Sequence, residues 1–290
     1  MSNTETRYCY RHPDRPTGLS CSECGRPICT DCMTPAAVGI RCPEHASGRS
    51  RPGRAAAGRP MIARAERRIG STHALVTKTL IAVNIAVYLV TAVQGAGLNS
   101  PGGSLYLKMV LYGPWVARGD WWRPVTAMFL HGFLLHIAFN MLALWWIGAP
   151  VEEYLGRARF IGLYFVSGLA GAAGAMLQSP TTPVVGASGA IFGILGAMLI
   201  LEYQATGRLT GNAMTWIVIN LVISFLPGTN ISWGGHVGGL IGGILVTLGY
   251  TRWDRSGSAY GRLGLGGALG LVLVAAGSLA LLYWQVRGYA

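Results

Sequence analysis

Two short motifs place a serine and a histidine near the starts of two apolar segments. Ser188 lies in Gly186-Ala187-Ser188-Gly189, and His236 lies in the glycine-rich run Gly234-Gly235-His236-Val237-Gly238-Gly239. A serine hydroxyl is a poor nucleophile until a neighbouring base accepts its proton. The pair therefore predicts acyl-transfer chemistry inside a membrane, with Ser188 as the nucleophile and His236 as the base.

Each of these residues also has a purely structural interpretation. A serine in an apolar helix usually donates a hydrogen bond to the carbonyl one turn earlier, and small flanking residues often indicate close helix packing. An ionisable histidine inside a membrane is harder to explain in this way, because such groups are costly there and face a cavity or a partner. His236 is therefore the stronger half of the pair.

Carboxylate side chains are absent from the predicted membrane spans. After Glu66, acidic residues occur only at predicted loops or span ends, at Asp120, Glu152, Glu153, Glu202 and Asp254. A Ser-His dyad is therefore predicted in place of a Ser-His-Asp triad. The same distribution argues against an aspartyl intramembrane protease, and the lack of an HExxH motif argues against a metalloprotease.

Hydrolysis also needs hydrogen-bond donors for the developing oxyanion. His136 and Asn140 are four residues apart and lie on one helical face. Both side chains can donate, as can the backbone N–H of Ser188 at the start of its helix. Asn140 has a second interpretation, an interhelical hydrogen bond that serves packing alone.

The elements that must position these residues are membrane helices. Apolar residues make up 51% of the 290 residues, charged residues make up 12%, and the mean hydropathy is +0.41. This composition indicates an all-α polytopic membrane protein, since a helix of about 20 apolar residues crosses a bilayer core. The predicted spans, of which the fifth is short, are Leu75–Val93, Phe129–Ile147, Phe160–Leu177, Val184–Leu201, Ala213–Leu226, Gly234–Tyr250 and Leu263–Tyr283.

Arginines set the predicted orientation. They precede the first span and recur in alternate later loops, at Arg49, Arg51, Arg54, Arg59, Arg64, Arg67, Arg68, Arg157, Arg159, Arg208, Arg252, Arg255 and Arg262. The positive-inside rule then predicts a cytosolic amino terminus and places Ser188 and His236 near the outer face. The net charge of +12 is explained by topology and anionic lipid headgroups, so no nucleic-acid partner is predicted.

The glycines around His236 are spaced for close helix packing. One series is Gly235, Gly239 and Gly243, and the other is Gly234, Gly238 and Gly242. Either series would let the helix of His236 approach the helix of Ser188 closely, at Gly189 and Gly193. The packing interpretation and the catalytic interpretation therefore support each other.

The amino-terminal residues 1–47 form a separate polar segment. Four pairs at two-residue spacing supply eight ligands, enough for two tetrahedral zinc sites: Cys9 and His12, Cys21 and Cys24, Cys29 and Cys32, Cys42 and His45. A cross-brace would put the first and third pairs on one ion and the second and fourth on the other, and a sequential pairing stays open. A disulfide framework is disfavoured by a cytosolic location and would leave the histidines unexplained. Residues 48–74 are predicted to be a flexible basic linker.

Four motifs together resemble the rhomboid family of intramembrane serine proteases. They are Trp122-Arg123, the segment from His131 to Asn140, Gly186-Ala187-Ser188-Gly189, and Gly235-His236-Val237-Gly238-Gly239. The resemblance implies a six-helix protease core over residues 75–250. It also implies a loop and one additional C-terminal transmembrane helix over residues 251–290.

The resemblance assigns roles to individual residues. It implies that Ser188 is the nucleophile, that His236 is the general base, and that His136, Asn140 and Gly186 shape the oxyanion hole. Phe192 stands where the family often has a tyrosine that stacks on the base. The Trp-Arg motif and Leu105 to Trp115 would form an interfacial loop, and Pro227 to Trp233 a movable cap.

The implied activity is hydrolysis of single-span membrane proteins near the outer face, with no catalytic metal. The residues leave a second class open, a non-catalytic rhomboid-like scaffold that binds transmembrane helices. The cysteine segment resembles a B-box-type zinc finger, which implies two structural zinc ions and a cytosolic protein partner. The absence of targeting signals and the Arg- and Ala-rich bias are typical of a bacterial plasma membrane protein.

Overall fold

The computed structural model describes residues 7–36, 39–46, 74–226, 231–253 and 263–290. The predicted linker at 48–74 lies outside the described residues except for Ala74, and the predicted cap is described only from Ile231 onward. The chain divides into two compact units, Met1–Gly58 and Arg59–Ala290, and the domain boundaries within them remain predictions.

The amino-terminal unit is small and is organised around its cysteines. Its elements are a 3₁₀ turn at Thr30–Cys32, an antiparallel pair of short strands, β1 (Thr34–Pro35) and β2 (Ile40–Arg41), and the helix α1 (Pro43–Ala46). Its buried apolar cluster consists of Ile28 and five cysteines, with Tyr10 and Ile40 packed against it. So small an apolar core is typical of a module that depends on metal for its stability.

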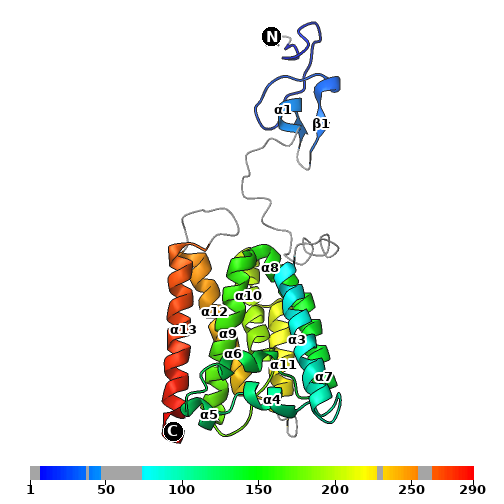
Figure 1. Ribbon diagram of the computed structural model, residues 1–290. Helices are drawn as coiled ribbons and strands as arrows, with labels where there is room; N and C mark the ends of the chain where they lie inside the picture. The colour runs from blue at the N-terminus through cyan, green and yellow to red at the C-terminus, as the bar shows by residue number, and fades with distance from the viewer. Residues whose placement is uncertain (1–6, 37–38, 47–73, 227–230, 254–262) are drawn as a thin grey trace. The chain divides into compact units, whose positions relative to one another are not determined.

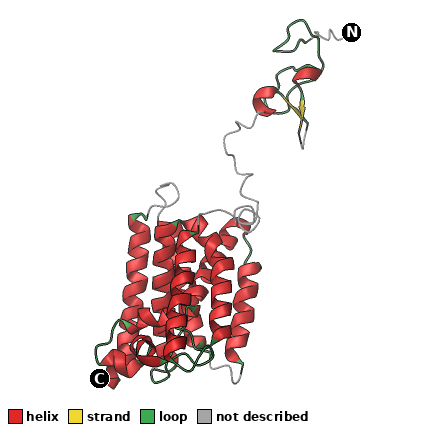
Figure 2. Cartoon of the chain, turned by 45° about the vertical axis from the view of Figure 1, so that its right-hand side comes forward, coloured by secondary structure: helices red, strands yellow, loops and turns green. Residues whose placement is uncertain are grey.

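The second unit is a bundle of long helices (Figures 1 and 2). A π-helical turn at Leu144–Gly148 joins α7 to α8, so these two form one continuous helix. The long elements are α3 (Leu75–Gln94), α7 (Leu134–Ala143) with α8 (Ala149–Leu155), α9 (Arg157–Gln178), α10 (Ser188–Thr206), α11 (Asn212–Phe225), α12 (Trp233–Leu248) and α13 (Leu265–Val286).

Five of the described helices are long and apolar enough to cross a membrane: α3, the joined α7 and α8, α9, α10 and α13. The other two predicted spans are shorter, since α11 has 14 residues and α12 has 16. A π-helical turn at Gly249–Trp253 extends α12. The chain is an integral membrane protein with a helical bundle, and the count of six spans plus one remains a prediction.

Two predicted span boundaries were wrong for the same physical reason. The second span was predicted from Phe129, but α7 begins at Leu134 because Leu130 and Phe133 have extended backbone angles. The fourth was predicted from Val184, but Val184 exchanges backbone hydrogen bonds with Leu111 at 2.9 and 3.1 Å, and α10 begins at Ser188. Apolar character alone does not distinguish an extended segment from a helix.

Three short helices, α4 (Gly103–Met109), α5 (Gly113–Ala117) and α6 (Arg123–Thr126), gather at one end of the bundle (Figure 1). The buried Arg123 connects them. Its Nη1 donates to the carbonyl oxygens of Leu107 at 2.7 Å and Val110 at 2.9 Å, and its guanidinium pairs with Asp120 at 2.7 Å. The guanidinium also lies 4.4 Å from the ring centroid of Trp115. Arg123 of the Trp-Arg motif therefore holds this segment in place.

Glycines bring the backbone of α12 against α9 and α10. A Cβ added at Gly239 would lie 1.9 Å from the carbonyl oxygen of Gly189, and one at Gly243 would lie 2.1 Å from that of Gly193. On the other face, a Cβ at Gly238 would lie 2.4 Å from the oxygen of Ala170. The predicted close approach is confirmed, and both glycine series are used, one for each neighbouring helix. We call the contact of α12 with α10 the glycine seam.

Candidate active site

Ser188 is the first residue of α10, directly after a tight turn. Gly186 has φ of +130°, a value that side-chain-bearing residues rarely adopt, and its N–H donates to the carbonyl oxygen of Ala127 at 3.0 Å. Ala187 is fully buried and precedes the first helical turn. The first N–H groups of a helix have no partner within it, so those of Ser188 and Gly189 are candidate donors for an anion.

His236 lies in the first turn of α12, and the start of this helix is tied to the end of α9. Ser232 caps the helix by accepting a hydrogen bond from the N–H of Gly235 at 3.2 Å. The side-chain oxygen of Gln178 accepts from the N–H of Gly234 at 2.8 Å and from the Ser232 hydroxyl at 3.1 Å. These hydrogen bonds fix the position of the first turn of α12, and therefore of His236, along the bundle axis.

The structure brings the predicted nucleophile and base together. Nε2 of His236 lies 2.9 Å from Oγ of Ser188, although the two residues are 48 positions apart in the chain. The ring of Phe192 stacks on the imidazole with a centroid distance of 4.1 Å and an interplanar angle of 17°. His236 is only 8% exposed. The predicted proximity and the predicted stacking are both present.

The second nitrogen of His236 has a partner that was not predicted. Nδ1 lies 2.7 Å from the hydroxyl of Ser224 on α11. Ser224 is also buried, and its hydroxyl donates to the carbonyl oxygen of Asn220 at 2.6 Å. In the sequence, Ser224 is an ordinary helical serine in the span with the weakest signal, so no local pattern distinguishes it.

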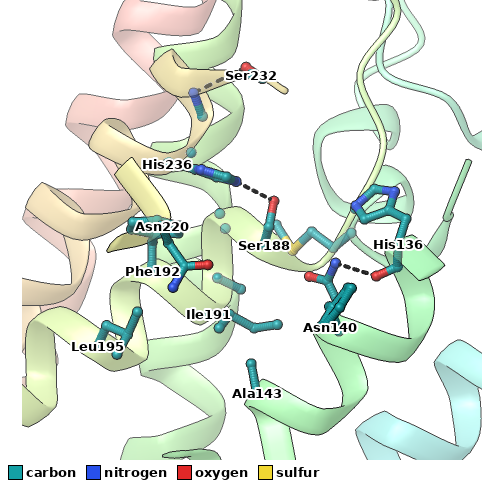
Figure 3. Close-up of a pocket in the computed structure, with 18 of the residues that line it drawn as sticks. His136, Asn140, Ala143, Ser188, Ile191, Phe192, Leu195, Asn220, Ser232 and His236 are labelled. Carbon is teal, nitrogen blue, oxygen red and sulfur yellow. Dashed lines mark hydrogen bonds between the residues drawn. The ribbon is translucent and has the colours of Figure 1, made fainter. Parts of the chain in front are cut away.

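His136 and Asn140 lie across the site from His236, with Ser188 between them (Figure 3). Nδ1 of His136 accepts from the N–H of Gly132 at 3.3 Å, and a Cβ added at Gly186 would lie 2.9 Å from Nε2 of His136. The amide of Asn140 donates to the carbonyl oxygen of His136 at 2.8 Å. The three residues predicted for an oxyanion hole therefore lie on the same side of Ser188.

A groove of about 1610 Å³ contains the site. Its walls come from α7, α9, α10, α11 and α12, and Ser188, His236, His136 and Asn140 all line it. Asn220 on α11 also lines the groove (Figure 3). The groove is larger than ordinary ligand pockets, which measure about 300 to 1,000 Å³.

Within the described part of the chain, no carboxylate hydrogen-bonds His236. Asp120 pairs with Arg123, Glu152 accepts hydrogen bonds from Val76 and Thr77 at the start of α3, and Glu202 accepts one from the N–H of Ala213. The observed contacts of the imidazole are thus those of a Ser-His pair with a second serine.

The eight cysteine and histidine residues form two clusters. One holds Cys9, His12, Cys29 and Cys32, the other holds Cys21, Cys24, Cys42 and His45, and the ligand atoms within each lie within 4.8 Å of one another. This is the cross-brace arrangement, which the sequence had left undecided against sequential pairing.

The spacing of the ligand atoms fits zinc. Nδ1 of His12 lies 3.4 Å from Sγ of Cys29 and of Cys32, and 3.8 Å from Sγ of Cys9. Ligands around a tetrahedral zinc ion, with Zn–S near 2.3 Å and Zn–N near 2.0 Å, are separated by about 3.5 to 3.8 Å. The first cluster therefore has the dimensions of a zinc site.

The electrostatic surroundings divide the thiols, since burial raises the pKa of Cys32 to about 11 and raises that of Cys42, whereas Cys9 and Cys21 have lowered values. Burial disfavours the thiolate of Cys9, but hydrogen bonds from the backbone at Cys29 and Arg11 outweigh it and lower the pKa of Cys9 to about 6. Burial is likewise outweighed at Cys21, where backbone hydrogen bonds at Cys42 and Cys24 lower the pKa to about 6. The thiolate is the form that binds zinc.

Comparisons with known proteins match the part of the chain that carries this site. The sequence model of the Rhomboid domain matches residues 118–253, which include every residue of the groove discussed above. The chain is 36% identical over 137 residues to the putative rhomboid protease YdcA of Bacillus subtilis, a match that covers 46% of this chain and 69% of that protein. It is 30% identical over 203 residues to the rhomboid protease AarA of Providencia stuartii, which covers 60% of this chain and 72% of that protein.

A third relative is much longer than the matched region. The rhomboid protease GluP of Bacillus subtilis is 37% identical over 178 residues, 59% of this chain, and the match spans only 34% of GluP. The family match begins beyond the amino-terminal unit, so it concerns the helical bundle alone. On the strength of these matches, this chain belongs to the rhomboid family.

Proposed function

We propose that this chain is an intramembrane serine endopeptidase that hydrolyses peptide bonds of single-span membrane proteins. The observation that carries the proposal is the 2.9 Å contact between Nε2 of His236 and Oγ of Ser188 at the starts of two membrane helices. The rhomboid proteases among its relatives support the same reaction class.

The reaction proceeds in two steps. Oγ of Ser188 attacks the scissile carbonyl while Nε2 of His236 accepts the hydroxyl proton, and the proton then passes to the leaving amine as the C–N bond breaks. Water next attacks the acyl-enzyme, again giving its proton to His236, and the carboxyl product leaves as Ser188 regains its proton. No metal takes part in either step.

The oxyanion is stabilised by donors on the far side of Ser188. His136, Asn140 and the backbone N–H of Ser188 can all donate to an oxygen held there, and Gly186 leaves the space that a side chain would fill. Removal of one such donor typically lowers kcat by about 10² to 10³. Asn140→Ala is therefore expected to lower kcat by about this factor.

The proposed site opens toward the outer face of the membrane. α7, α10 and α12 all begin at the end of the bundle where α4, α5 and α6 gather (Figure 1). With a cytosolic amino terminus, as the arginines predict, this end faces outward. The proposed location is a bacterial plasma membrane, with six spans in the protease core and one added at the carboxyl end.

The test is cleavage of a single-span substrate by the full chain in liposomes. Ser188→Ala and His236→Ala are each expected to abolish cleavage and labelling by a fluorophosphonate. Ser278→Ala is the matched control, because Ser278 is a buried helical serine whose hydroxyl donates to the carbonyl oxygen of Val274, one turn earlier in its own helix. Retained cleavage in either site variant, or no cleavage by folded wild-type protein across several substrates, would overturn the proposal and favour a non-catalytic helix-binding scaffold.

We further propose that the amino-terminal unit binds two structural zinc ions and a cytosolic protein partner. The two four-residue clusters and the spacing of the ligand atoms in the first of them support the metal. Measurement of two zinc ions per purified chain would support the assignment, and a metal-free folded unit would contradict it.

A further inference from the structure

The imidazole of His236 lies between two serine hydroxyls from different helices. Ser188 on α10 faces Nε2 at 2.9 Å, and Ser224 on α11 faces Nδ1 at 2.7 Å. Phe192 stacks on the ring plane and offers no hydrogen-bond acceptor. Among the described residues, the side-chain contact that can decide which ring nitrogen carries the proton is therefore the one with Ser224.

The hydrogen-bond inventory of Ser224 decides the direction of this contact. A serine hydroxyl has one proton to donate and two lone pairs to accept with. The contact of Ser224 with the carbonyl oxygen of Asn220, at 2.6 Å, requires that proton, because a carbonyl oxygen can only accept. Toward His236 the hydroxyl oxygen can therefore only accept, so Nδ1 is the donor.

The state of the second nitrogen follows directly. A neutral imidazole has a single N–H, and with that proton on Nδ1 the lone pair of Nε2 points at Ser188. The opposite tautomer would place an N–H on Nε2, where it could not accept the proton of the nucleophile. It would also leave Nδ1 and the Ser224 oxygen as two facing acceptors 2.7 Å apart.

We propose that Ser224 is a positioning residue that holds His236 in the Nδ1–H tautomer, in the place that a carboxylate takes in a Ser-His-Asp site. The inference deepens the proposed peptidase function and rests on it for its kinetic consequence. The carbonyl oxygen of Asn220 accepts the hydroxyl proton of Ser224, so the hydroxyl oxygen is left to accept the proton of Nδ1. The same oxygen continues to accept from Nδ1–H when His236 becomes an imidazolium. A neutral hydroxyl stabilises that cation less than a carboxylate would.

The position of Ser224 adds a requirement on α11. Ser188 and His236 lie on two helices joined by the glycine seam, whereas Ser224 is presented from α11, whose other faces carry exposed apolar residues such as Val218, Val222 and Phe225. The tautomer of the base therefore depends on α11 staying against α12, although the distance between Ser188 and His236 does not.

The first test measures directly which ring nitrogen of His236 carries the proton, and it does not require substrate cleavage. The full chain, labelled with ¹⁵N-histidine and assigned with His236→Ala, is measured by NMR in detergent micelles or bicelles. The expected result is a His236 imidazole protonated at Nδ1 in wild-type protein and in Ser278→Ala, with a mixed or Nε2-protonated ring in Ser224→Ala. An Nε2-protonated ring in the wild type, or an unchanged ring in Ser224→Ala, would refute the inference.

The second test separates positioning from packing. Ser224→Ala is expected to lower kcat by about tenfold with KM unchanged, since one buried neutral hydrogen bond is lost and the groove keeps its shape. Ser224→Thr is expected to restore most of kcat, because a threonine hydroxyl in a helix can also donate to the carbonyl one turn earlier. A raised KM, or no recovery in Ser224→Thr with fold intact, would indicate a merely structural role.

The two tests keep this inference distinct from the proposed function. If the chain is not a peptidase, every variant and the wild type lack turnover while the tautomer measurement still gives its answer. If Ser224 has no positioning role, the wild type cleaves substrate and the tautomer does not respond to Ser224→Ala. A variant that fails to fold leaves the wild-type tautomer as the deciding observation.

Discussion

Gly239→Ala is predicted to separate the two residues of the proposed dyad without touching either of them. The added Cβ would lie 1.9 Å from the carbonyl oxygen of Gly189, whereas ordinary van der Waals contact begins near 3.4 Å. Neither backbone can rotate out of the way as a side chain would, so α10 and α12 must move apart by about 1.5 Å at this point.

The displacement acts almost directly on the site. Gly189 follows Ser188 in the chain, and Gly239 lies one helical turn after His236. A contact of 2.9 Å between Oγ and Nε2 would lengthen to roughly 4.4 Å if the whole displacement of about 1.5 Å reached it, which is beyond hydrogen-bond range. A misplacement of about 1 Å lowers rates by about 10²-fold, so kcat/KM is expected to fall by at least this factor.

The assay is cleavage of a single-span substrate in liposomes, together with circular dichroism and a thermal melt of each variant. Gly277→Ala in α13 is the matched control, because a Cβ there has no heavy atom within 4 Å, and it should cleave normally with equal or higher stability. Gly239→Ala protein that is folded and cleaves at the wild-type rate would refute the reasoning, because the seam would then not set the distance.

Three further predictions concern stability and metal content. Arg123→Lys should lower the free energy of unfolding by about 2 to 4 kcal/mol, which a thermal melt in detergent would detect. The reason is that a lysine cannot reach Asp120 and the carbonyl oxygens of Leu107 and Val110 together. Glu152→Gln should lower the free energy of unfolding by about 1 to 2 kcal/mol, which denaturant titration would measure. The reason is that the carboxylate accepts hydrogen bonds from the backbone N–H groups of Val76 (2.9 Å) and Thr77 (2.7 Å) at the start of α3. Cys29→Ser should reduce bound zinc from two ions toward one, measured by mass spectrometry of the purified full chain, with substrate cleavage unchanged.

Each of these has a result that would contradict it. Arg123→Lys with an unchanged melting temperature would mean that the short helices are held by apolar packing alone. Glu152→Gln as stable as the wild type would show that water replaces the cap, with Glu153→Gln as the neighbouring control. Loss of cleavage in Cys29→Ser would contradict the expectation that substrate cleavage does not require the amino-terminal clusters.

The sequence predicted those parts of the site that depend on spacing within one helix or on glycine at a contact. Ser188 and His236 each stand in a glycine-rich motif, and the small residues needed for their helices to meet are visible in the same motifs. Two clusters of cysteine and histidine were likewise predictable, because the ligand pairs recur at two-residue spacing. The sequence could not predict whether the ligand pairs adopt the cross-brace or the sequential arrangement, because both use the same eight residues and differ only in the path of the chain.

The rest depends on tertiary structure. An apolar residue such as Val184 fits a helix or an extended segment equally well. Its backbone pairs with Leu111, about 70 residues away, and this pairing keeps Val184 extended before α10 begins. Ser224 was missed because its contact with His236 is made between two helices, and its local pattern is that of any serine that bonds back to its own helix. A contact between residues on different helices produces no spacing pattern in a single sequence, so it cannot be predicted from one.

The glycine seam also divides the molecule mechanically. Backbone atoms in direct contact have no rotamers to exchange, so α10 and α12 are expected to behave as one stiff body that carries both the proposed nucleophile and the proposed base. The walls formed by α7 and α11 carry large exposed apolar side chains, which lipid would surround in a membrane. Changes in bilayer thickness or fluidity should therefore alter how readily a substrate helix is admitted, while the spacing of the reacting atoms stays constant.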